Sequence, residues 1–266
     1  MFDAALRGFS HTMQALFETP QIRLGGVDMA TQAAVVSRQS QRRFYTGIAV
    51  VIAGIVFAGF ARTYYLRGFF TTEPLSGLLH LHGLVFTSWL LLFVTQTTLV
   101  AAGRTDIHRR LGVAGGVLAA TMPVVGVLTA IHAAQHGGTP LGMPPLRFIA
   151  IPLGDLSVFS ILVTAALLYR RKPEIHKRLM LCATIAILAP ATSRLPFAFI
   201  RHIGPVAFFG LADLVLLACI VYDLVSRRKV HPAYWWAAFL IVASQPLRLI
   251  LSGTHAWLAF AQWLTR

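Results

Sequence analysis

The chain has 266 residues, of which 56% are apolar and only 12% are charged, against about 25% charged residues in a soluble domain. Its formal charge of +14 comes from 23 Lys and Arg against 9 Asp and Glu, and these basic residues lie in short segments between apolar runs. Composition excludes an ordinary soluble domain, and the absence of aromatic residues interleaved with the basic ones argues against a nucleic-acid partner. Anionic lipid head groups at the cytoplasmic face of a lipid bilayer are the expected counter-charge.

The chain begins with residues 1–43, which are polar and mixed and predict a loosely ordered cytoplasmic tail. The first apolar run starts at Phe44, too late for an ordinary signal peptide, so it is expected to act as an uncleaved signal anchor. This run is the first of seven apolar stretches, each long enough to cross roughly 30 Å of hydrocarbon as a helix. They cover residues 44–62, 75–102, 110–134, 147–169, 178–200, 205–226 and 233–253.

The last residues, 254–266, place Trp257 and Leu264 at helical spacing, which predicts an interfacial helix. With the N-terminus inside, fourteen Lys and Arg lie in or beside the inner segments, and the outer segments hold Arg62, Arg67, Arg201 and Arg266. The bias alternates at every span, as the positive-inside rule requires. The sequence therefore predicts an all-α, polytopic membrane domain over residues 44–253, with seven transmembrane helices, its N-terminus inside and its C-terminus outside.

Short motifs recur between these spans. DIHRRL at residues 106–111 matches EIHKRL at residues 174–179, and GDL at 154–156 matches ADL at 212–214. The pattern predicts one leading helix followed by three helical hairpins in the same orientation, a parallel repeat. Chance similarity among short basic loops is the alternative explanation.

Ionisable side chains fall inside the apolar spans toward the outer surface. A charged side chain in mid-membrane costs about 2.5 to 3.5 kcal/mol even on the lenient insertion scale, so these side chains must face each other or a wet cavity. Within each of the last two hairpins the expected pairs are Asp155 with Arg194 and Asp213 with Arg248. Together with His82, these four residues are the candidate ligand-binding site.

Two explanations of this site stay open. One is structural, with ion pairs that only fix the register of the helices. The other is a polar pocket in the outer leaflet half that binds a cation, a proton or a small polar ligand. Prolines within the spans favour the pocket, because each weakens backbone hydrogen bonding beside the charged residues. These prolines are Pro123, Pro152, Pro190, Pro196 and Pro246.

The histidines suggest further chemistry. His80 and His82 are two residues apart on a helix, so only one of them can face the bundle, and His82 is expected to. Candidate metal ligands are His82, His132 and Asp155. His108 and His176 begin matching helices at the inner surface, where they serve either as interfacial anchors or as part of a bis-histidine haem b redox protein.

A third possible function is a proton-coupled small-molecule transporter, suggested by proline-broken helices and a parallel repeat. Cys182 and Cys219 lie in separate apolar spans without CxxC spacing, which argues against a disulfide or a zinc knuckle. No catalytic residue is assigned, and whether the chain is an enzyme stays open.

Several stretches resemble a group of uncharacterised bacterial multi-pass conserved membrane proteins. They are HGLVFTSWLLLF (82–93), DIHRRLG (106–112), IPLGDL (151–156), EIHKRLM (174–180) and GLADL (210–214). The resemblance covers about residues 44–264. It implies a bacterial cytoplasmic (inner) membrane as the location, and it implies no activity, cofactor or catalytic residue.

Overall fold

The computed structural model describes residues 29–136 and 142–266, which are helical or irregular and contain no strand. By its internal contacts the chain divides into two compact units, residues 1–43 and 44–266. In chain order the elements are α2 (Met29–Phe60), η1 (Ala61–Tyr65), η2 (Arg67–Phe69), α3 (Gly77–Ala101), α4 (Thr105–Gln135), α5 (Pro145–Phe148), α6 (Ala150–Leu168), α7 (Pro173–Ala186), α8 (Ala189–Thr192), α9 (Ala198–Ile203), α10 (Pro205–Arg227), α11 (Pro232–Ser252) and α12 (His255–Leu264).

Within the described residues, seven helical stretches are long and apolar enough to cross a membrane. They are Gln39–Tyr65, Gly77–Ala101, Thr105–Gln135, Pro145–Leu168, Pro173–Thr192, Pro205–Arg227 and Pro232–Ser252. The chain thus has the make-up of a multi-pass membrane protein, as its hydropathy predicts.

The structure can be compared with the predictions made for the two ends of the chain. The loose tail predicted for residues 1–28 lies outside the described residues, but residues 29–43 are helical and form the first part of α2. The helix predicted after residue 254 is present as α12, with its N-terminus capped by the Thr254 hydroxyl, which accepts from the backbone N–H of Trp257.

Local sequence explains where several helices begin. Proline occupies the first turn of α7, α10 and α11, at Pro173, Pro205 and Pro232, where its missing N–H removes no hydrogen bond and its fixed φ suits a helix. At the start of α3 the Ser76 hydroxyl accepts from the backbone N–H of Leu79. These residues set the helix starts independently of tertiary packing.

The fifth span is not the continuous helix that was predicted over residues 178–200. Helix α7 ends at Ala186, α8 is a single turn, and α9 begins only at Ala198. Pro190 has no N–H to donate to the carbonyl of Ala186, so the helical ladder is interrupted there. By contrast, α4 and α11 continue past Pro123 and Pro246, so proline by itself did not decide which helix breaks.

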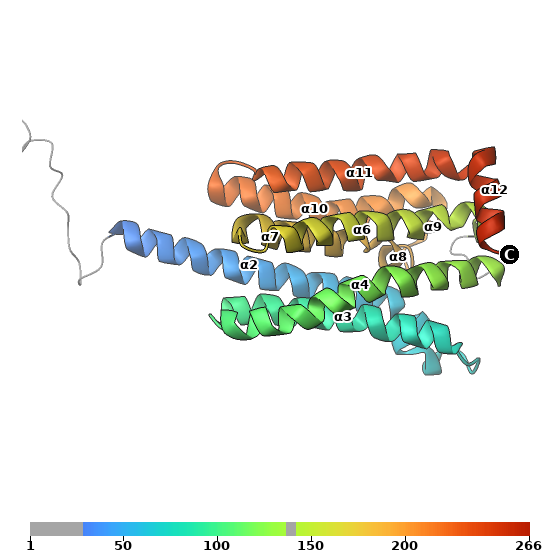
Figure 1. Cartoon of the computed structure of the whole chain (residues 1–266), viewed down its shortest axis with the longest axis horizontal. Helices are drawn as coiled ribbons and strands as arrows, with labels where there is room; N and C mark the ends of the chain where they lie inside the picture. Colours follow the sequence, from blue (N-terminus) through green and yellow to red (C-terminus); the bar gives the residue numbers. More distant parts are fainter. Residues whose placement is uncertain (1–28, 137–141) are drawn as a thin grey trace, which may run out of the picture. The chain divides into compact units, whose positions relative to one another are not determined.

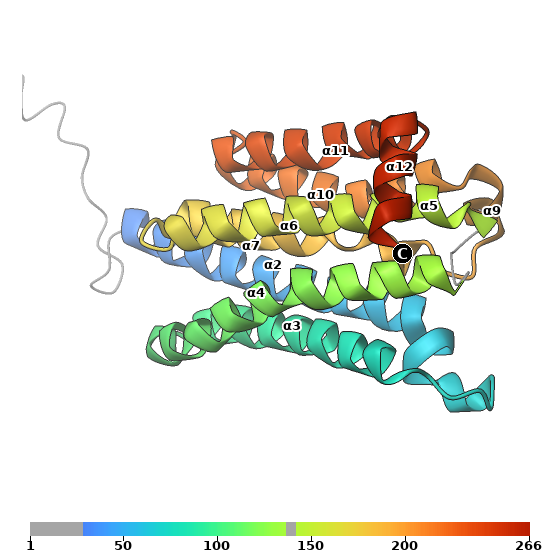
Figure 2. The same ribbon diagram turned by 45° about the vertical axis from the view of Figure 1, so that its right-hand side comes forward.

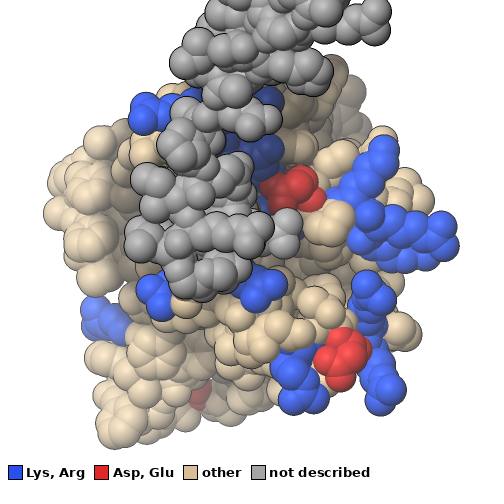
Figure 3. Space-filling model, turned by 90° about the vertical axis from the view of Figure 1, so that its left-hand side faces the viewer, with Lys and Arg blue, Asp and Glu red and all other residues tan. Residues whose placement is uncertain are grey.

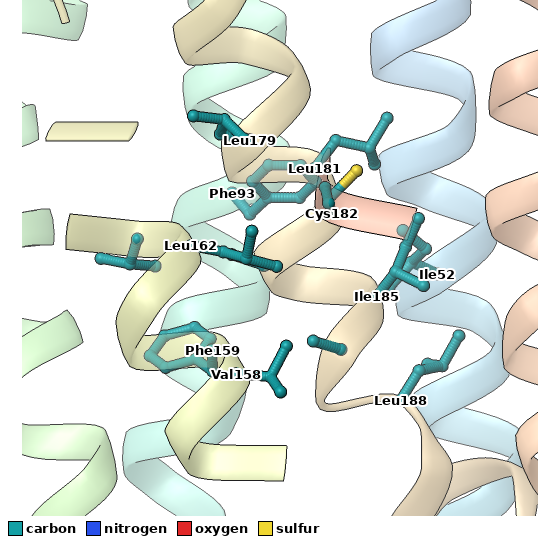
Figure 4. Packing of buried hydrophobic residues seen from close by; sticks show 14 of the residues in the cluster. Ile52, Phe93, Val158, Phe159, Leu162, Leu179, Leu181, Cys182, Ile185 and Leu188 are labelled. Atoms are coloured by element: carbon teal, nitrogen blue, oxygen red, sulfur yellow. The ribbon is translucent and has the colours of Figure 1, made fainter. Parts of the chain in front are cut away.

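The α6–α7 hairpin lies in the middle of the 44–266 unit, between α3 and α4 on one side and α10 and α11 on the other (Figures 1 and 2). The span Pro173–Thr192 is the most buried of the seven. Figure 4 shows how Phe159 of α6 and Ile185 of α7 pack with Ile52 of α2 and Phe93 of α3. The core is therefore built around this hairpin.

The short connections between α3 and α4, α6 and α7, and α10 and α11 lie at one end of the unit, which we call the basic end (Figure 1). Their sequences carry Arg104, Arg170, Arg171, Lys172, Arg228 and Lys229. On the face seen in Figure 3, Lys and Arg outnumber Asp and Glu. The opposite end, with η1, α5, α8, α9 and α12, is called the cavity end.

Close packing of α2 on α8 gives a stability prediction. A Cβ added at Gly59 would lie 2.2 Å from the backbone oxygen of Ala191, and a backbone atom cannot move aside as a flexible side chain can. Gly59→Ala is therefore expected to lower the free energy of unfolding by about 1–3 kcal/mol, as measured by thermal denaturation of the detergent-solubilised protein.

Gly54 of the same helix is the matched control. A Cβ there would meet nothing within 4 Å, so Gly54→Ala should leave stability unchanged or raise it by up to about 1 kcal/mol, because alanine has the higher helix propensity. Equal melting temperatures for the two variants would show that α2 does not pack on α8 in this way.

Candidate functional site

A cavity of about 450 Å³ lies at the cavity end, and it is lined by residues from α2 through α8, from the segment after α8 and from α10. The break between α7 and α8 places Pro190, Ser193 and Arg194 in its wall. Most of the lining is apolar, with a few polar side chains from different helices. We call it the polar cavity.

Three of the five predicted site residues line the polar cavity, namely His82, Asp155 and Arg194. Asp213 and Arg248 are not part of its lining. The structure thus brings part of the predicted site together and leaves the rest outside, and the reason lies in how the charges pair.

The Asp155 carboxylate pairs with Arg248 of α11 and not with Arg194 as predicted. Both side chains are buried, and a second Arg248 nitrogen donates to the Ser244 hydroxyl at 2.7 Å. Gly154 makes room for this contact, because a Cβ there would lie 2.3 Å from Arg248 Cδ. The second Asp155 oxygen, Oδ2, has no hydrogen-bond partner among the described residues.

Asp213 is also partnered differently from the prediction. Its Oδ1 accepts from the side-chain amide of Gln245 at 2.9 Å. Gln245 and Arg248 are three residues apart on α11, so they point in directions about 60° apart, one toward α10 and the other toward α6. Both predicted pairs are therefore wrong: Asp155 pairs with Arg248 of the other hairpin, and Asp213 stays within its own hairpin but bonds to Gln245 instead of Arg248.

Arg194 has no carboxylate partner among the described residues. Its Nη1 donates to the carbonyl of Pro190 at 2.7 Å and makes a long contact of 3.5 Å to the Ser193 hydroxyl. The guanidinium carbon lies 4.8 Å from the centre of the Phe60 ring. A guanidinium stays charged in proteins, so this wall of the cavity carries a positive charge that no acid of the described residues balances.

The start of α3 contributes another part of the lining. His82 stacks on Phe86 with ring centres 4.2 Å apart, and its Nδ1 has no hydrogen-bond partner among the described residues. His80 is exposed, so the prediction that His82 faces the bundle is confirmed. Gly83 leaves space for Tyr64 of η1, since a Cβ at Gly83 would lie 2.1 Å from that ring.

Metal binding finds no support in this arrangement. The described residues contain no group of three or more His, Cys, Asp or Glu side chains that could hold a metal ion. His82, His132 and Asp155 all line the polar cavity without forming such a group.

The histidines also bear on the haem alternative. At the basic end the rings of His108 and His176 lie 6.4 Å apart, and His176 Nδ1 lies 2.8 Å from the carbonyl oxygen of Ala166. At the cavity end the histidine rings in contact, His132 and His136, belong to one helix. Axial ligation of a haem b needs histidines from facing elements, which the His108–His176 pair has and the His132–His136 pair, on one helix, does not.

A buried ion cluster at the basic end was missed by the sequence analysis. Arg178, only 1% exposed, pairs with Asp223 of α10 and with Glu174, and Glu174 also accepts from Arg227 at 2.6 Å. The other Asp223 oxygen accepts from the backbone N–H of His231 at 2.8 Å. In the sequence, the signals for this cluster were the acid Asp223 inside the sixth predicted span and the basic residues of segment 174–178. Only the fold shows that the two lie in contact.

His231 completes this cluster as the cap of α11, where its Nδ1 accepts from the backbone N–H of Ala233 at 3.1 Å. Burial, with the charges of Arg178 and Arg227, lowers the pKa of His231 below its ordinary value. The ring is therefore neutral at neutral pH, as an accepting Nδ1 requires.

Comparison of the chain with known protein families, with curated proteins and with solved structures finds no match. The polar cavity and the basic-end cluster therefore have to be interpreted from their own geometry. The fold and the cavity define the class of protein as a multi-pass, all-α membrane protein with the polar cavity at one end.

Proposed function

We propose that this is a bacterial cytoplasmic-membrane protein whose polar cavity, in the outer leaflet half, binds a small ligand. The observation that carries the proposal is the cavity itself, which has apolar walls and a few polar groups from different helices. That combination is typical of small-molecule sites, whose volumes run from about 300 to 1,000 Å³. The broken α7–α8 segment supports it, because irregular backbone at membrane depth is tolerated where it lines a cavity.

The proposed orientation places the basic end in the cytoplasm, on the strength of the positive-inside bias. Anionic lipid head groups would then be the partners of the Lys and Arg side chains seen in Figure 3. The matching motifs at residues 106–111 and 174–179 support a parallel repeat as the origin of the hairpins.

Filling the cavity tests the binding function. Ala133 of α4 lines the cavity, so Ala133→Phe should displace a ligand by occupying its space. Radiolabelled decanol, a neutral probe, is expected to bind saturably to the wild-type protein in lipid nanodiscs and at least about tenfold more weakly to this variant, a loss of about 1.4 kcal/mol. Scintillation proximity counting against empty nanodiscs measures the difference.

The matched control is Leu128→Phe on the same helix, where the side chain is 49% exposed and lies outside the cavity lining. This variant should bind decanol as the wild type does. If decanol binds all three proteins equally, or none of them saturably, the polar cavity is not a ligand site.

A further inference from the structure

We infer that the cavity's ligand is an anionic amphiphile, with a short apolar chain or ring held by the walls and a carboxylate or phosphate held by Arg194. The inference rests on the proposed binding function and adds the chemical class of the ligand. It follows from the charge balance of the cavity, from the hydrogen-bonding capacity of Arg194 and from the character of the remaining walls.

The charge balance of the lining is positive. Its formally charged members are Arg67, Arg194 and a single acid, Asp155. Asp155 is already paired with Arg248, which approaches from outside the cavity, so its negative charge does not compensate Arg194. A cation entering this space would meet an unbalanced guanidinium, whereas an anion would supply the missing counter-charge in surroundings where electrostatic interactions are strong.

Arg194 has hydrogen-bonding capacity left for such an anion. Its hydrogen bonds with the described residues use Nη1 alone, toward Pro190 and Ser193, while Nε and Nη2 have no hydrogen-bond partner among them. The planar guanidinium matches the geometry of carboxylate and phosphate oxygens, and it can bind them through two parallel hydrogen bonds. The Nε–Nη2 edge is one of the two edges of a guanidinium that can form such a pair of hydrogen bonds.

The rest of the cavity suits an apolar body. Its lining includes six large apolar side chains, namely Phe60, Phe86, Phe148, Phe208, Leu79 and Leu90. At about 450 Å³ the cavity lies in the lower half of the range for small-molecule sites, which favours one short chain or ring system over a two-chain lipid.

The test compares probes that share one chain and differ in the head group. Decanoate, decyl phosphate, decanol and decyltrimethylammonium are each bound to the wild-type protein in nanodiscs of zwitterionic lipid, with empty nanodiscs as the blank. One or both anionic probes are expected to bind about ten- to a hundredfold more tightly than decanol, since a hydrogen bond to a charged group contributes about 1.5–3 kcal/mol. Which anion binds more tightly distinguishes a carboxylate from a phosphate ligand.

Substitution of Arg194 locates the effect. Arg194→Gln should reduce the affinity for the anionic probe to that for decanol without changing decanol binding, and Arg194→Lys should retain part of the preference because it keeps the charge. Arg110→Gln, at the opposite end of the bundle, is the control and should change neither affinity.

Two results would overturn the inference. In the first, decanol or the cationic probe binds the wild-type protein as tightly as the anions, an outcome that decides the question even where Arg194→Gln does not fold. In the second, Arg194→Gln weakens the binding of decanol as much as the binding of the anion, which makes Arg194 a structural residue. Either result leaves the binding function standing if Ala133→Phe still blocks decanol, so the two proposals fail separately.

Discussion

Arg248→Leu is expected to lower the free energy of unfolding by about 3–5 kcal/mol. The substitution leaves the Asp155 carboxylate, which is 3% exposed, buried without its counter-charge. Asp155→Leu should have an effect of similar size, since it leaves the guanidinium of Arg248 unpaired. Unfolding by sodium dodecyl sulfate in mixed micelles, followed by circular dichroism, measures the change.

The double variant Asp155→Leu/Arg248→Leu is the informative control. Removing both charges of a buried pair is often close to neutral, so stability should return to within about 1 kcal/mol of the wild type. The double variant Asp155→Leu/Arg194→Leu should show no such recovery, because those two residues are not paired. Recovery in the second double variant and not in the first would contradict the pairing found here.

Arg178→Leu is expected to cost about 3–5 kcal/mol as well. This substitution removes the buried guanidinium that joins α7 to Asp223 of α10 and that lies 5.6 Å from the centre of the Tyr234 ring. Asp223 is 2% exposed, so its carboxylate would stay buried with only the His231 backbone N–H as partner. Arg178→Lys should recover only part of the loss, because a lysine cannot form the planar, forked contact.

Arg227→Gln is the matched control at the same end of the bundle. Arg227 is 25% exposed and pairs with the half-exposed Glu174, and ion pairs of this kind contribute about 0–1 kcal/mol. Its melting temperature should stay close to that of the wild type. If Arg227→Gln and Arg178→Leu lower stability equally, burial does not distinguish the two arginines, and the Arg178–Asp223 pair does not stabilise the contact between α7 and α10.

Hydropathy predicted the helices well because the requirement behind it is local. A span must satisfy its own backbone hydrogen bonds and present apolar side chains to lipid, so composition within some twenty residues is enough to locate it. The six spans other than residues 178–200 were predicted within a few residues at most ends. The largest shifts were at α2 and α4, whose helices extend into the polar flanking segments.

The broken fifth span shows where local reasoning stops. Pro123, Pro190 and Pro246 all lie within predicted spans, yet only the helix at Pro190 is interrupted. The same missing N–H is tolerated in α4 and α11 and ends the ladder in α7. The structure around each proline decides between these outcomes. At α8, next to the break, the neighbours are the α2 backbone at Gly59 and the carbonyl of Phe208, which accepts from the Thr192 hydroxyl at 2.7 Å.

By itself the sequence determined the number and approximate positions of the apolar spans, the basic character of one set of loops, and the presence of charged residues within the spans. Only the tertiary structure decided that Asp155 meets Arg248, that Asp223 meets Arg178, and that Arg194 lines a cavity without an acid beside it. The physical reason is that depth depends on position along one helix, whereas pairing depends on the rotation of two helices about their axes and on which helices are neighbours. Packing of the α6–α7 hairpin against α11 settles both of these for Asp155.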